Sequence, residues 1–351
     1  MPFDLAILAG TTPADDLAAA EQVEVSERIG EPSTFRLRYR LVDVDQDYPL
    51  LLDDRLAPGA ELTVAAKAGD DQAVLVKGQV HGHRVNLMRG VGTSMVEVSG
   101  GDKCFEMDRE IKTKLWTGVT ASDAVSSVLS SYGVTADVDA LSTKHTDDTH
   151  PLVQRDTDLR FVRRLAVRYG HWFWMSTDVA GTTTAHFKRP ALTGPPVATI
   201  GLDDDPATLD ELEIEWDVER PTAAIGLELK LADLSTLDGQ VARTPLPPLG
   251  GVAYADVAAA RQVQITANVD DLGDLQARAE ASLIDGGWFV CARGRANARA
   301  VGKVLRPHTV IAVSGLGTRH SGKYVVAAVR HTIEGDAHMM DFELLRNAWE
   351  A

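Results

Sequence analysis

The clearest structural signal in this chain lies at residues 153–175, which read VQRDTDLRFVRRLAVRYGHWFWM. Asp156 or Thr157 fits a helix N-cap, because a short side-chain oxygen there can accept a hydrogen bond from a backbone N–H two or three residues later. Gly170 fits the C′ position of a helix, where the backbone needs a positive φ. Apolar residues recur between them at helical spacing: Phe161, Val162, Leu165, Ala166 and Tyr169. The segment predicts a short amphipathic helix followed by an aromatic strand.

Length and charge exclude several classes of protein. The chain has 351 residues, enough for two or three domains. Lys and Arg total 35 against 51 Asp and Glu, and the formal net charge is −16. Phosphate backbones and anionic membranes repel so acidic a chain, so we expect neither nucleic acid nor a membrane as partner. No apolar run approaches the ~20 residues that cross a bilayer, and no basic region suggests a signal peptide. We expect assembly in the cytoplasm.

The pattern along the chain predicts an α+β, β-rich fold in three parts. Residues 1–113 contain short alternating runs separated by Gly and Pro turns, which is typical of a small barrel or sandwich. Residues 114–200 are mixed, with a helix at 121–131 before the segment quoted above. Residues 201–351 return to alternating strands, with a helix near 271–285. We therefore predict two β-barrel-like domains with a mixed α/β module between them.

An internal similarity links the two β regions. Residues 78–101 and 322–345 each begin with glycine and continue as an alternating strand with a central pair of His and Arg. Each then turns at glycine and enters a second strand that contains an apolar-Glu-apolar triplet around Glu97 or Glu343. We predict that one β unit is duplicated within the chain. The alternative is that two ordinary hairpins look alike.

Residues with catalytic or metal-binding potential do not form a recognisable site in the sequence. His81 and His83 lie on one side of a predicted strand but lack an obvious third metal ligand. His331 and His338 are expected to face each other across a hairpin. The sequence contains no nucleophile elbow, no dinucleotide loop and no carboxylate pair in a glycosidase context. We expect no catalytic residue, metal or cofactor, and we expect Cys104 and Cys291 to be buried free thiols.

Residues 153–175 resemble an element of the spike hubs of contractile injection machines, which reads roughly Q-x-x-x-S/T-D-x-x-F-V/L-x-R-L-x-x-x-x-G before an aromatic strand. That group includes the phage late control protein D family, the baseplate hub of T4-like phages, and the hub half of the valine-glycine-repeat spike of type VI secretion. The matching residues here are Gln154, Asp158, Phe161, Val162, Arg164, Leu165, Gly170, Trp172 and Phe173.

The C-terminal region resembles the end of late control D proteins, approximately R-P-G-x-x-V/I-x-V/L-x-G-L/V-G-x-x-F/H-S-G-x-Y-x-V-x-x-V-x-H and then F-x-x-x-x-x-x-R-N. Here it spans residues 306–347, and His308 replaces the glycine of the family. Together with the helix expected at 121–131, these matches follow the order of the family along most of the chain. The structural motif residues that we single out are Gln154, Asp156, Asp158, Phe161, Arg164, Leu165, Gly170, Trp172, Phe173, Gly315, Gly317, Gly322, Tyr324 and His331.

The resemblance implies a structural hub without a catalytic step, assembled in the bacterial cytoplasm. Such a hub is a homotrimer that adapts the hexameric inner tube of a phage tail, or of a phage-derived extracellular injection system, to a trimeric spike. Two tube-like β domains per chain match both symmetries, because three copies supply six barrels. The chain ends soon after the second β region, so the resemblance implies a separate spike protein. Further implied partners are the inner tube protein and the inner baseplate proteins.

Two functions of other classes stay open in the sequence. A tail-tip enzyme that degrades cell walls would need a carboxylate site that we do not recognise. A carbohydrate-binding tail protein would use Trp172 and Trp174, which share one face of a predicted strand. Packing in a core or an interface is the interpretation that we favour for these indoles.

Overall fold

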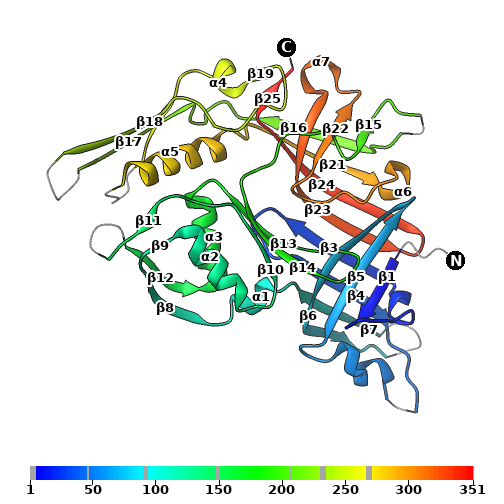
Figure 1. Ribbon diagram of the computed structural model, residues 1–351. Coiled ribbons are helices and arrows are strands. Elements are labelled where there is room, and N and C mark those ends of the chain that lie inside the picture. The colour runs from blue at the N-terminus through cyan, green and yellow to red at the C-terminus, as the bar shows by residue number, and fades with distance from the viewer. Residues whose placement is uncertain are drawn as a thin grey trace.

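The computed structural model describes residues 5–45, 47–89, 94–147, 151–205, 207–229, 235–265 and 271–350. The fold is α+β and β-rich, with 19% of the described residues helical and 46% in strands, which confirms the predicted fold class. Figure 1 shows the N-terminal strands at the lower right, the C-terminal strands above them, and a helix-containing module beside both. None of the helices in the described residues combines the length and apolarity that crossing a membrane requires.

Strands from both ends of the chain form one large sheet. The N-terminal strands are β1 (Leu5–Ala9), β2 (Thr12–Pro13), β3 (Gln22–Arg28), β4 (Thr34–Arg40), β5 (Glu61–Ala68), β6 (Asp71–Asn86) and β7 (Met95–Gly101). The C-terminal strands are β15 (Thr199–Gly201), β16 (Glu211–Trp216), β21 (Val290–Asn297), β22 (Val310–Ser314), β23 (Gly322–Glu334) and β24 (Ala337–Arg346). Among the described residues this sheet has 13 strands, in the order β16-β21-β24-β23-β3-β4-β7-β6-β5-β1-β2, with β22 beside β23 and β15 beside β22.

Alternating side chains explain why these segments form strands. Successive residues of a strand point to opposite faces, so every second residue enters the core. In β3, Val23 and Val25 are buried, and in β4 the same alternation buries Phe35, Leu37 and Tyr39. These residues belong to a hydrophobic core that both ends of the chain share.

The two halves of the sheet have the same strand order. We call β1 and β3 to β7 the N-terminal β unit, and β15, β16 and β21 to β24 the C-terminal β unit. The first is ordered β3-β4-β7-β6-β5-β1 in space and the second β16-β21-β24-β23-β22-β15. When the six strands of each unit are numbered along the chain, both orders become 2-3-6-5-4-1. The units differ in one pairing, because β1 is antiparallel to β5 whereas β15 is parallel to β22. The common order supports the predicted duplication.

The mixed module lies between the units in sequence and has its own hydrophobic core. Its helices are α1 (Cys104–Met107), α2 (Ala121–Ser130) and α3 (Asp158–Arg168). Its strands are β8 (Ile111–Trp116), β9 (Val119–Thr120), β10 (Thr135–Val138), β11 (Lys144–His145), β12 (Leu152–Thr157), β13 (Trp172–Thr177) and β14 (Thr183–Lys188). Thr120 and Asp123 form a capping box at the start of α2, so the helix expected at 121–131 is confirmed.

A helix and a small sheet are inserted between β16 and β21. The sheet has the order β18-β17-β20 and is formed by β17 (Ala223–Leu229), β18 (Thr236–Val241) and β20 (Gln262–Ile265). Helix α5 (Leu272–Gly286) begins after Asp271, whose side chain accepts a hydrogen bond from Asp274 N, so the helix predicted near 271–285 is confirmed. Gly226 allows close packing, because a Cβ atom there would lie 2.7 Å from Leu275.

Short elements complete the C-terminal part: β19 (Val252–Ala253), α4 (Tyr254–Val257), α6 (Ala298–Val301), α7 (Gly317–His320) and β25 (Ala348–Trp349). Three short 3-10 helices precede β3 or β5: η1 (Leu17–Ala19), η2 (Pro49–Leu52) and η3 (Asp54–Leu56). Cys104 and Cys291 are both free thiols, as predicted. Cys291 is only partly buried, which corrects our expectation, because it lies near the edge of the sheet on the strand next to β16. The domain boundaries predicted from sequence stay a prediction.

Candidate functional site

The N-terminal end of α3, the helix that the sequence predicted most clearly, is capped by Thr157 and tied back to β12. Thr157 is the N-cap, and its hydroxyl oxygen accepts a hydrogen bond from Arg160 N at 3.3 Å. Asp156, the other predicted cap, instead accepts a hydrogen bond from Arg164 Nε at 3.2 Å. Arg164 Nη2 also donates to Val153 O at 3.1 Å, which ties the helix back to β12. Phe161 and Leu165, both motif residues, are fully buried.

Gly170 ends this helix in a conformation that glycine adopts most easily. Its φ is +66°, as the C′ interpretation predicted. A Cβ atom at this position would lie 2.6 Å from Ile284 Cδ1 and 3.1 Å from Ala281 Cα, both on α5. Gly170 therefore permits the end of α3 to pack against a helix of the C-terminal part, a contact that no local pattern in the sequence indicates.

Gly170→Ala should lower the free energy of unfolding by about 2–3 kcal/mol, because alanine is strained at positive φ and its Cβ would overlap α5. Gly133→Ala is the matched control, since Gly133 has a φ of +66° and a Cβ atom there would meet nothing within 4 Å. We expect a loss of about 1 kcal/mol there, from strain alone. Equal losses in urea unfolding of the two variants would contradict the packing contact between α3 and α5.

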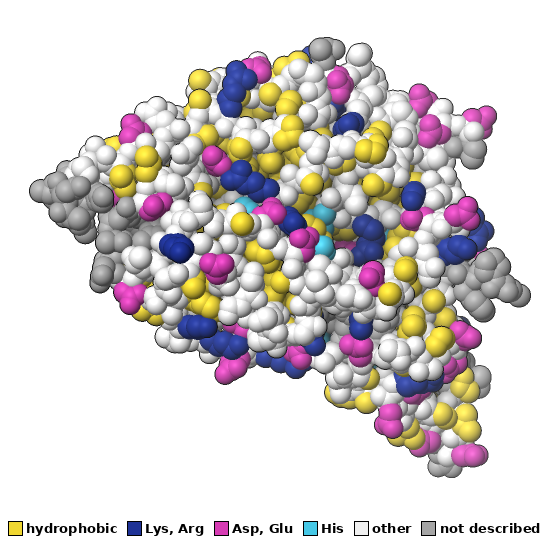
Figure 2. Space-filling view, viewed as in Figure 1, with side chains coloured by type: hydrophobic (Ala, Val, Ile, Leu, Met, Phe, Trp, Pro, Cys, Tyr) yellow, Lys and Arg dark blue, Asp and Glu magenta, His cyan; other side chains and the backbone are white. Residues whose placement is uncertain are grey.

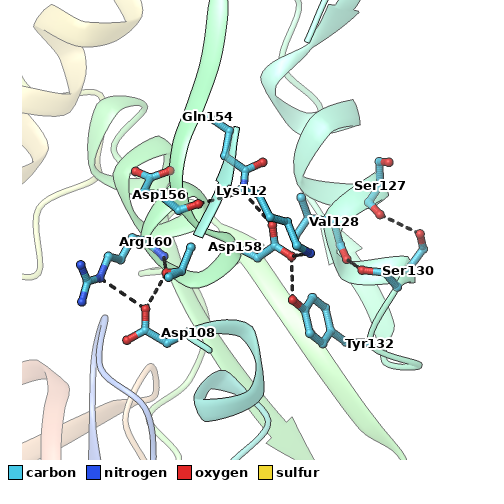
Figure 3. A network of polar contacts seen from close by, with 12 residues as sticks. Asp108, Lys112, Ser127, Val128, Ser130, Tyr132, Gln154, Asp156, Asp158 and Arg160 are labelled. Carbon is cyan, nitrogen blue, oxygen red and sulfur yellow. Dashed lines mark hydrogen bonds and ion pairs between the residues drawn. The ribbon is translucent and has the colours of Figure 1, made fainter. Parts of the chain in front are cut away.

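A buried carboxylate, Asp158 on α3, is bonded to β8, to β12 and to the turn after α2 (Figure 3). Its Oδ2 atom accepts hydrogen bonds from Lys112 Nζ at 2.5 Å and from Tyr132 Oη at 2.6 Å. Its Oδ1 atom accepts a hydrogen bond from Gln154 Nε2 at 2.7 Å. Gln154 in turn accepts from Trp116 Nε1 at 3.4 Å. Two of the motif residues, Gln154 and Asp158, are thus brought together, and both are nearly inaccessible to solvent.

The charge of Asp158 is stabilised by its donors. Burial alone raises the pKa of this carboxyl, but the hydrogen bonds from Lys112, Tyr132 and Gln154 outweigh it and hold the pKa below its ordinary value. Burial and the bond to Asp158 also raise the pKa of Tyr132. A carboxylate with a lowered pKa and three donors accepts hydrogen bonds and is not a proton donor. We interpret the network as a structural one.

Asp158→Asn should destabilise the protein by about 2 kcal/mol, because the amide group cannot accept from all three donors and Lys112 loses its counter-charge. Asp156→Asn is the control on the same segment. The Asp156–Arg164 pair is more exposed, so we expect a loss below about 1 kcal/mol. Thermal and urea unfolding of both variants measure the difference. An Asp158→Asn variant with the same free energy of unfolding as the wild type would show that the network does not stabilise the fold.

The aromatic motif residues connect the mixed module to the C-terminal β unit. The Trp172 ring stacks on Trp288 with centroids 5.8 Å apart and meets His308 at 5.5 Å. The Trp174 ring stacks on His308 at 3.9 Å and on His186 at 4.5 Å. Both indoles thus contact rings of their own chain, which supports the packing interpretation of this strand face. Phe173, on the other face, is buried in the core of the module.

A second group of motif residues surrounds a buried guanidinium at the end of β24. Arg346 has no exposed side-chain surface, and it donates to Leu249 O at 3.2 Å, to Ser321 O at 3.1 Å and to Glu350 Oε1 at 2.7 Å. A Cβ atom at Gly322 would lie 2.7 Å from Arg346 Nη2, which explains the glycine of the motif. The family pattern ends in Arg-Asn, and the corresponding residues here are Arg346 and Asn347. Both form hydrogen bonds with residues 247–249, the connector before β19.

The remaining motif residues of this region lie around the same end of the unit. Tyr324 is fully buried and donates to His320 O at 2.7 Å. Gly315 has a φ of +75°, and a Cβ atom there would lie 2.4 Å from Asp203 Oδ1. Gly317 also has a positive φ, +71°, but open space around it. These residues shape turns and packing and do not converge on one pocket.

The last motif residue, His331, lies in a buried polar cluster where β3 meets β23. Its Nδ1 atom is 3.0 Å from His338 Nε2, so the two imidazoles do face each other across the hairpin as predicted. Its Nε2 atom is 3.5 Å from the Glu27 carboxylate, which also accepts from Arg306 Nη2 at 2.6 Å. Burial lowers the pKa of His331 despite that carboxylate. The cluster joins strands from the two β units.

The sequence did not identify Glu27, Arg306, Lys112 and Tyr132 as members of these networks. One signal was available for Glu27, because it lies in phase with the buried Val23 and Val25 of the same strand. A carboxylate at an inward-facing position of a strand requires a partner. The partner itself, Arg306, is 279 residues away, and no local pattern identifies it.

The described residues contain no group of three or more His, Cys, Asp or Glu side chains placed to hold a metal ion. Two of the α3 arginines have acidic neighbours, since Arg160 pairs with Asp108 at 3.3 Å and Arg164 with Asp156. Figure 2 shows basic and acidic side chains interspersed over the face in view. The contacts described above bind strands, helices and turns to one another, which is what a structural component requires.

Comparison with known proteins gives a family and a fold. The model of the Alg8 N-terminal domain family matches residues 3–335. No curated protein matches. A tail protein from Neisseria meningitidis MC58 aligns with a TM-score of 0.67 at 15% identity, over 98% of this chain and 96% of its own. The 43 kDa tail protein of prophage MuSo2 from Shewanella oneidensis also gives 0.67, at 14% identity over 98% of both chains.

A third similar structure comes from a secretion system. An E. coli component of the type VI secretion system, described as structurally similar to T4 bacteriophage tail proteins, aligns with a TM-score of 0.59 and 13% identity. The alignment covers 93% of this chain and 73% of that one. At these identities the three structures establish the fold. The chain has the fold of phage tail and type VI secretion proteins, and it belongs to the Alg8 N-terminal domain family.

Proposed function

We propose that the protein is the structural baseplate or spike hub of a contractile injection particle, either a phage tail or a phage-derived extracellular injection system. In this role it is a homotrimer that adapts the hexameric inner tube to a trimeric spike, as in the late control D arrangement. Its partners are the spike protein, the inner tube protein and the inner baseplate proteins. It performs no catalytic step, and it is assembled in the bacterial cytoplasm.

One observation carries this proposal: the chain contains two β units with the same strand order. A trimer of such chains presents six similar units toward a six-fold ring and keeps three-fold symmetry toward a spike. The similarity in fold to phage tail proteins supports the same assignment. The proposed domains are residues 1–113, 114–200 and 201–351.

The motif residues have a role in this proposal, although none of them binds a small ligand in it. A hub transmits force when the sheath contracts, so its modules must keep their relative positions. Asp158 with Gln154 stiffens the mixed module, Trp172 joins it to the C-terminal unit, and His331 lies at the joint between the β units. Buried polar and aromatic contacts between modules suit that demand better than exposed ion pairs do.

Light scattering on the purified protein, alone and with a candidate spike protein, tests the proposal. We expect a particle of three times the chain mass of 37.8 kDa, and a stable complex with a trimeric spike. A protein that stays monomeric with the spike present would contradict the proposed symmetry adaptor. In that case muralytic activity and glycan binding become the assays to run, since they belong to the two alternative functions.

A further inference from the structure

The two β units correspond residue by residue in their hairpins. In the β6–β7 hairpin the ladder register shifts between Val80 and Gly82, and in the β23–β24 hairpin it shifts between Val326 and Ala328. Both pairs differ by 246 in residue number, so β6 and β23 align with one constant offset through the bulge. A bulge is a specific local feature of a strand pair, and its recurrence at one aligned position fixes the alignment of the two units.

The turn before each hairpin supports the same alignment. Gly59 has a φ of +85° and its N–H donates to Val80 O at 2.8 Å. His308 has a φ of +67° and its N–H donates to Val326 O at 3.0 Å. Gly59 and His308 therefore occupy equivalent turns, and both have a left-handed backbone conformation. His308 stands where the family has glycine. It adopts this conformation while its ring stacks on Trp174.

The pairings across each unit extend the alignment to β3 and β16. In the N-terminal unit one line of paired residues runs through Arg84, Glu97, Arg38 and Gln22. In the C-terminal unit the equivalent line runs through Arg330, Asp341, Arg295 and Glu211. Gln22 and Glu211 are the last residues of the two lines, so they are equivalent positions. Residues of β3 and β16 therefore correspond with an offset of 189 in residue number.

Within the chain the two units are joined by one strand pair. The far half of β23 pairs along its second edge with β3, where Arg330 lies opposite Ser26 and His331 opposite Val25. The equivalent edges are those of β6 beyond Gln79 and of β16. No strand of the described residues pairs with either of these edges. Within one chain, β23 and β3 thus form one joint between the units. The two strand edges that would form an equivalent joint, on β6 and β16, have no partner strand among the described residues.

We propose that β6 of one copy of this chain pairs with β16 of a second copy, in the register of the joint between β23 and β3. The offsets of 246 and 189 convert the observed pairs into predicted ones. Arg330 opposite Ser26 becomes Arg84 opposite Glu215. The other two pairs that matter place Val85 opposite Ile214 and Leu87 opposite Leu212. The two copies bind through main-chain hydrogen bonds of an antiparallel strand addition.

The side chains at these positions are complementary, although the register was derived from backbone pairing alone. Arg84 and Glu215 have opposite charges, and cross-strand ion pairs and apolar pairs both stabilise a sheet. Val85 is 41% exposed and Leu87 is 56% exposed in the single chain. Glu215 is 73% exposed at its side chain, and its contact with Arg293 is long, at 4.0 Å. An open edge with exposed apolar residues favours pairing with another chain.

The geometry of this interface is head-to-tail, because β6 of each copy binds β16 of the next. Interfaces of this kind close into rings when the rotation between copies allows it. Internal joints between β23 and β3 then alternate around the ring with joints between β6 and β16. Three copies give six units in one continuous sheet, and this count rests on the proposed function. The strand pairing itself does not depend on the number of copies.

A charge exchange tests the register in the full-length protein. Arg84→Glu and Glu215→Arg each place like charges opposite each other, and we expect each to weaken self-association at least tenfold by sedimentation velocity. The double variant restores the opposite charges and should regain most of the association. Arg155→Glu is the matched control. It changes the net charge by the same amount as Arg84→Glu, at an exposed position on β12. It should leave association unchanged.

A cysteine pair tests the same register without relying on charge. Asn86→Cys and Glu213→Cys are predicted to lie directly opposite each other across the interface, so mild oxidation should link copies covalently. Cys291 lies opposite Glu215 on β21, so the experiment uses a Cys291→Ser background. Asn86→Cys with Glu211→Cys shifts the register by two residues and should cross-link much more slowly, because diagonal neighbours are farther apart.

The outcomes separate this inference from the proposed function. A trimer that shows neither charge rescue nor cross-linking would overturn the strand pairing and leave the hub intact. Cross-linked rings with another number of copies would support the pairing and overturn the trimer. A monomer that neither associates nor cross-links at any concentration would overturn both.

Discussion

Arg346→Ala is expected to lower the free energy of unfolding by about 3–5 kcal/mol, because it deletes a large, fully buried side chain together with its hydrogen bonds. The guanidinium has no exposed surface, and the carbonyls of Leu249 and Ser321 and the Glu350 carboxylate depend on it. Alanine would leave the buried Leu249 carbonyl without this donor and would open a cavity, while the Glu350 carboxylate, which is 38% exposed, would lose its counter-charge. Urea unfolding followed by circular dichroism measures the loss.

Two further substitutions separate the causes of that loss. Arg346→Lys keeps the charge, but a single ammonium cannot reach all three acceptors, so we expect an intermediate loss. Arg36→Ala is the surface control, because the Arg36 side chain is 61% exposed and lies 3.8 Å from Glu24. Its effect should stay within about 0.5 kcal/mol. An Arg346→Ala variant as stable as Arg36→Ala would show that the buried guanidinium does not hold the C-terminal connector.

Glu27→Ala is expected to cost a similar amount, about 3–5 kcal/mol, because it removes the counter-charge of Arg306 at the joint between the β units. Glu27 lies on β3, and the residues that approach it are Arg306, before β22, and His331 on β23. Arg306 also donates to Val74 O and Leu75 O of β6, so the cluster connects both units. Glu24→Ala is the control on the same strand, where the side chain faces the other side.

The loss of stability caused by Glu27→Ala should depend on pH, and the pKa of the Glu27 carboxyl gives the sign of that dependence. Burial raises the pKa of this carboxyl, but Arg306 and His331 outweigh burial and hold the pKa below its ordinary value. A group with a lowered folded pKa contributes stability above its unfolded pKa, ~4.3 for glutamate, and loses it as the pH falls through the folded pKa. The difference between wild type and Glu27→Ala should therefore shrink below about pH 4. A difference that grows on acidification would contradict the assignment of Glu27 as a paired carboxylate.

Much of the assignment to a tail-protein fold was accessible from sequence, because its signals are local. The spacing of Phe161 and Leu165 and the position of Gly170 predicted α3, and the structure has that helix with that stop. The alternation in β3 and β4 predicted their strands in the same way. The similarity of residues 78–101 and 322–345 predicted a duplication, which the common strand order supports. In each case the determinant acts within a few residues along the chain.

The partners across the molecule were not accessible in this way. Sequence identified Gln154 and Asp158 as motif residues, but it did not connect them to Lys112 and Tyr132, which close the network from other elements. The sequence placed Trp172 on a strand. The Trp172 ring stacks on Trp288, which lies 116 residues later in the chain. Packing of this kind depends on the whole tertiary arrangement, because many apolar residues could fill the same space.

By itself, the sequence determined the main helices and strands and the alternation that buries one face of β3 and β4, and it predicted that a β unit occurs twice. These properties follow from backbone sterics, capping and periodicity, which operate between near neighbours. Only the tertiary structure decided that β23 pairs with β3, that Glu27 meets Arg306, and that the edges of β6 and β16 stay open among the described strands. Strand edges offer the same main-chain donors and acceptors whatever the sequence, so their pairing is selected by the fold of the entire chain.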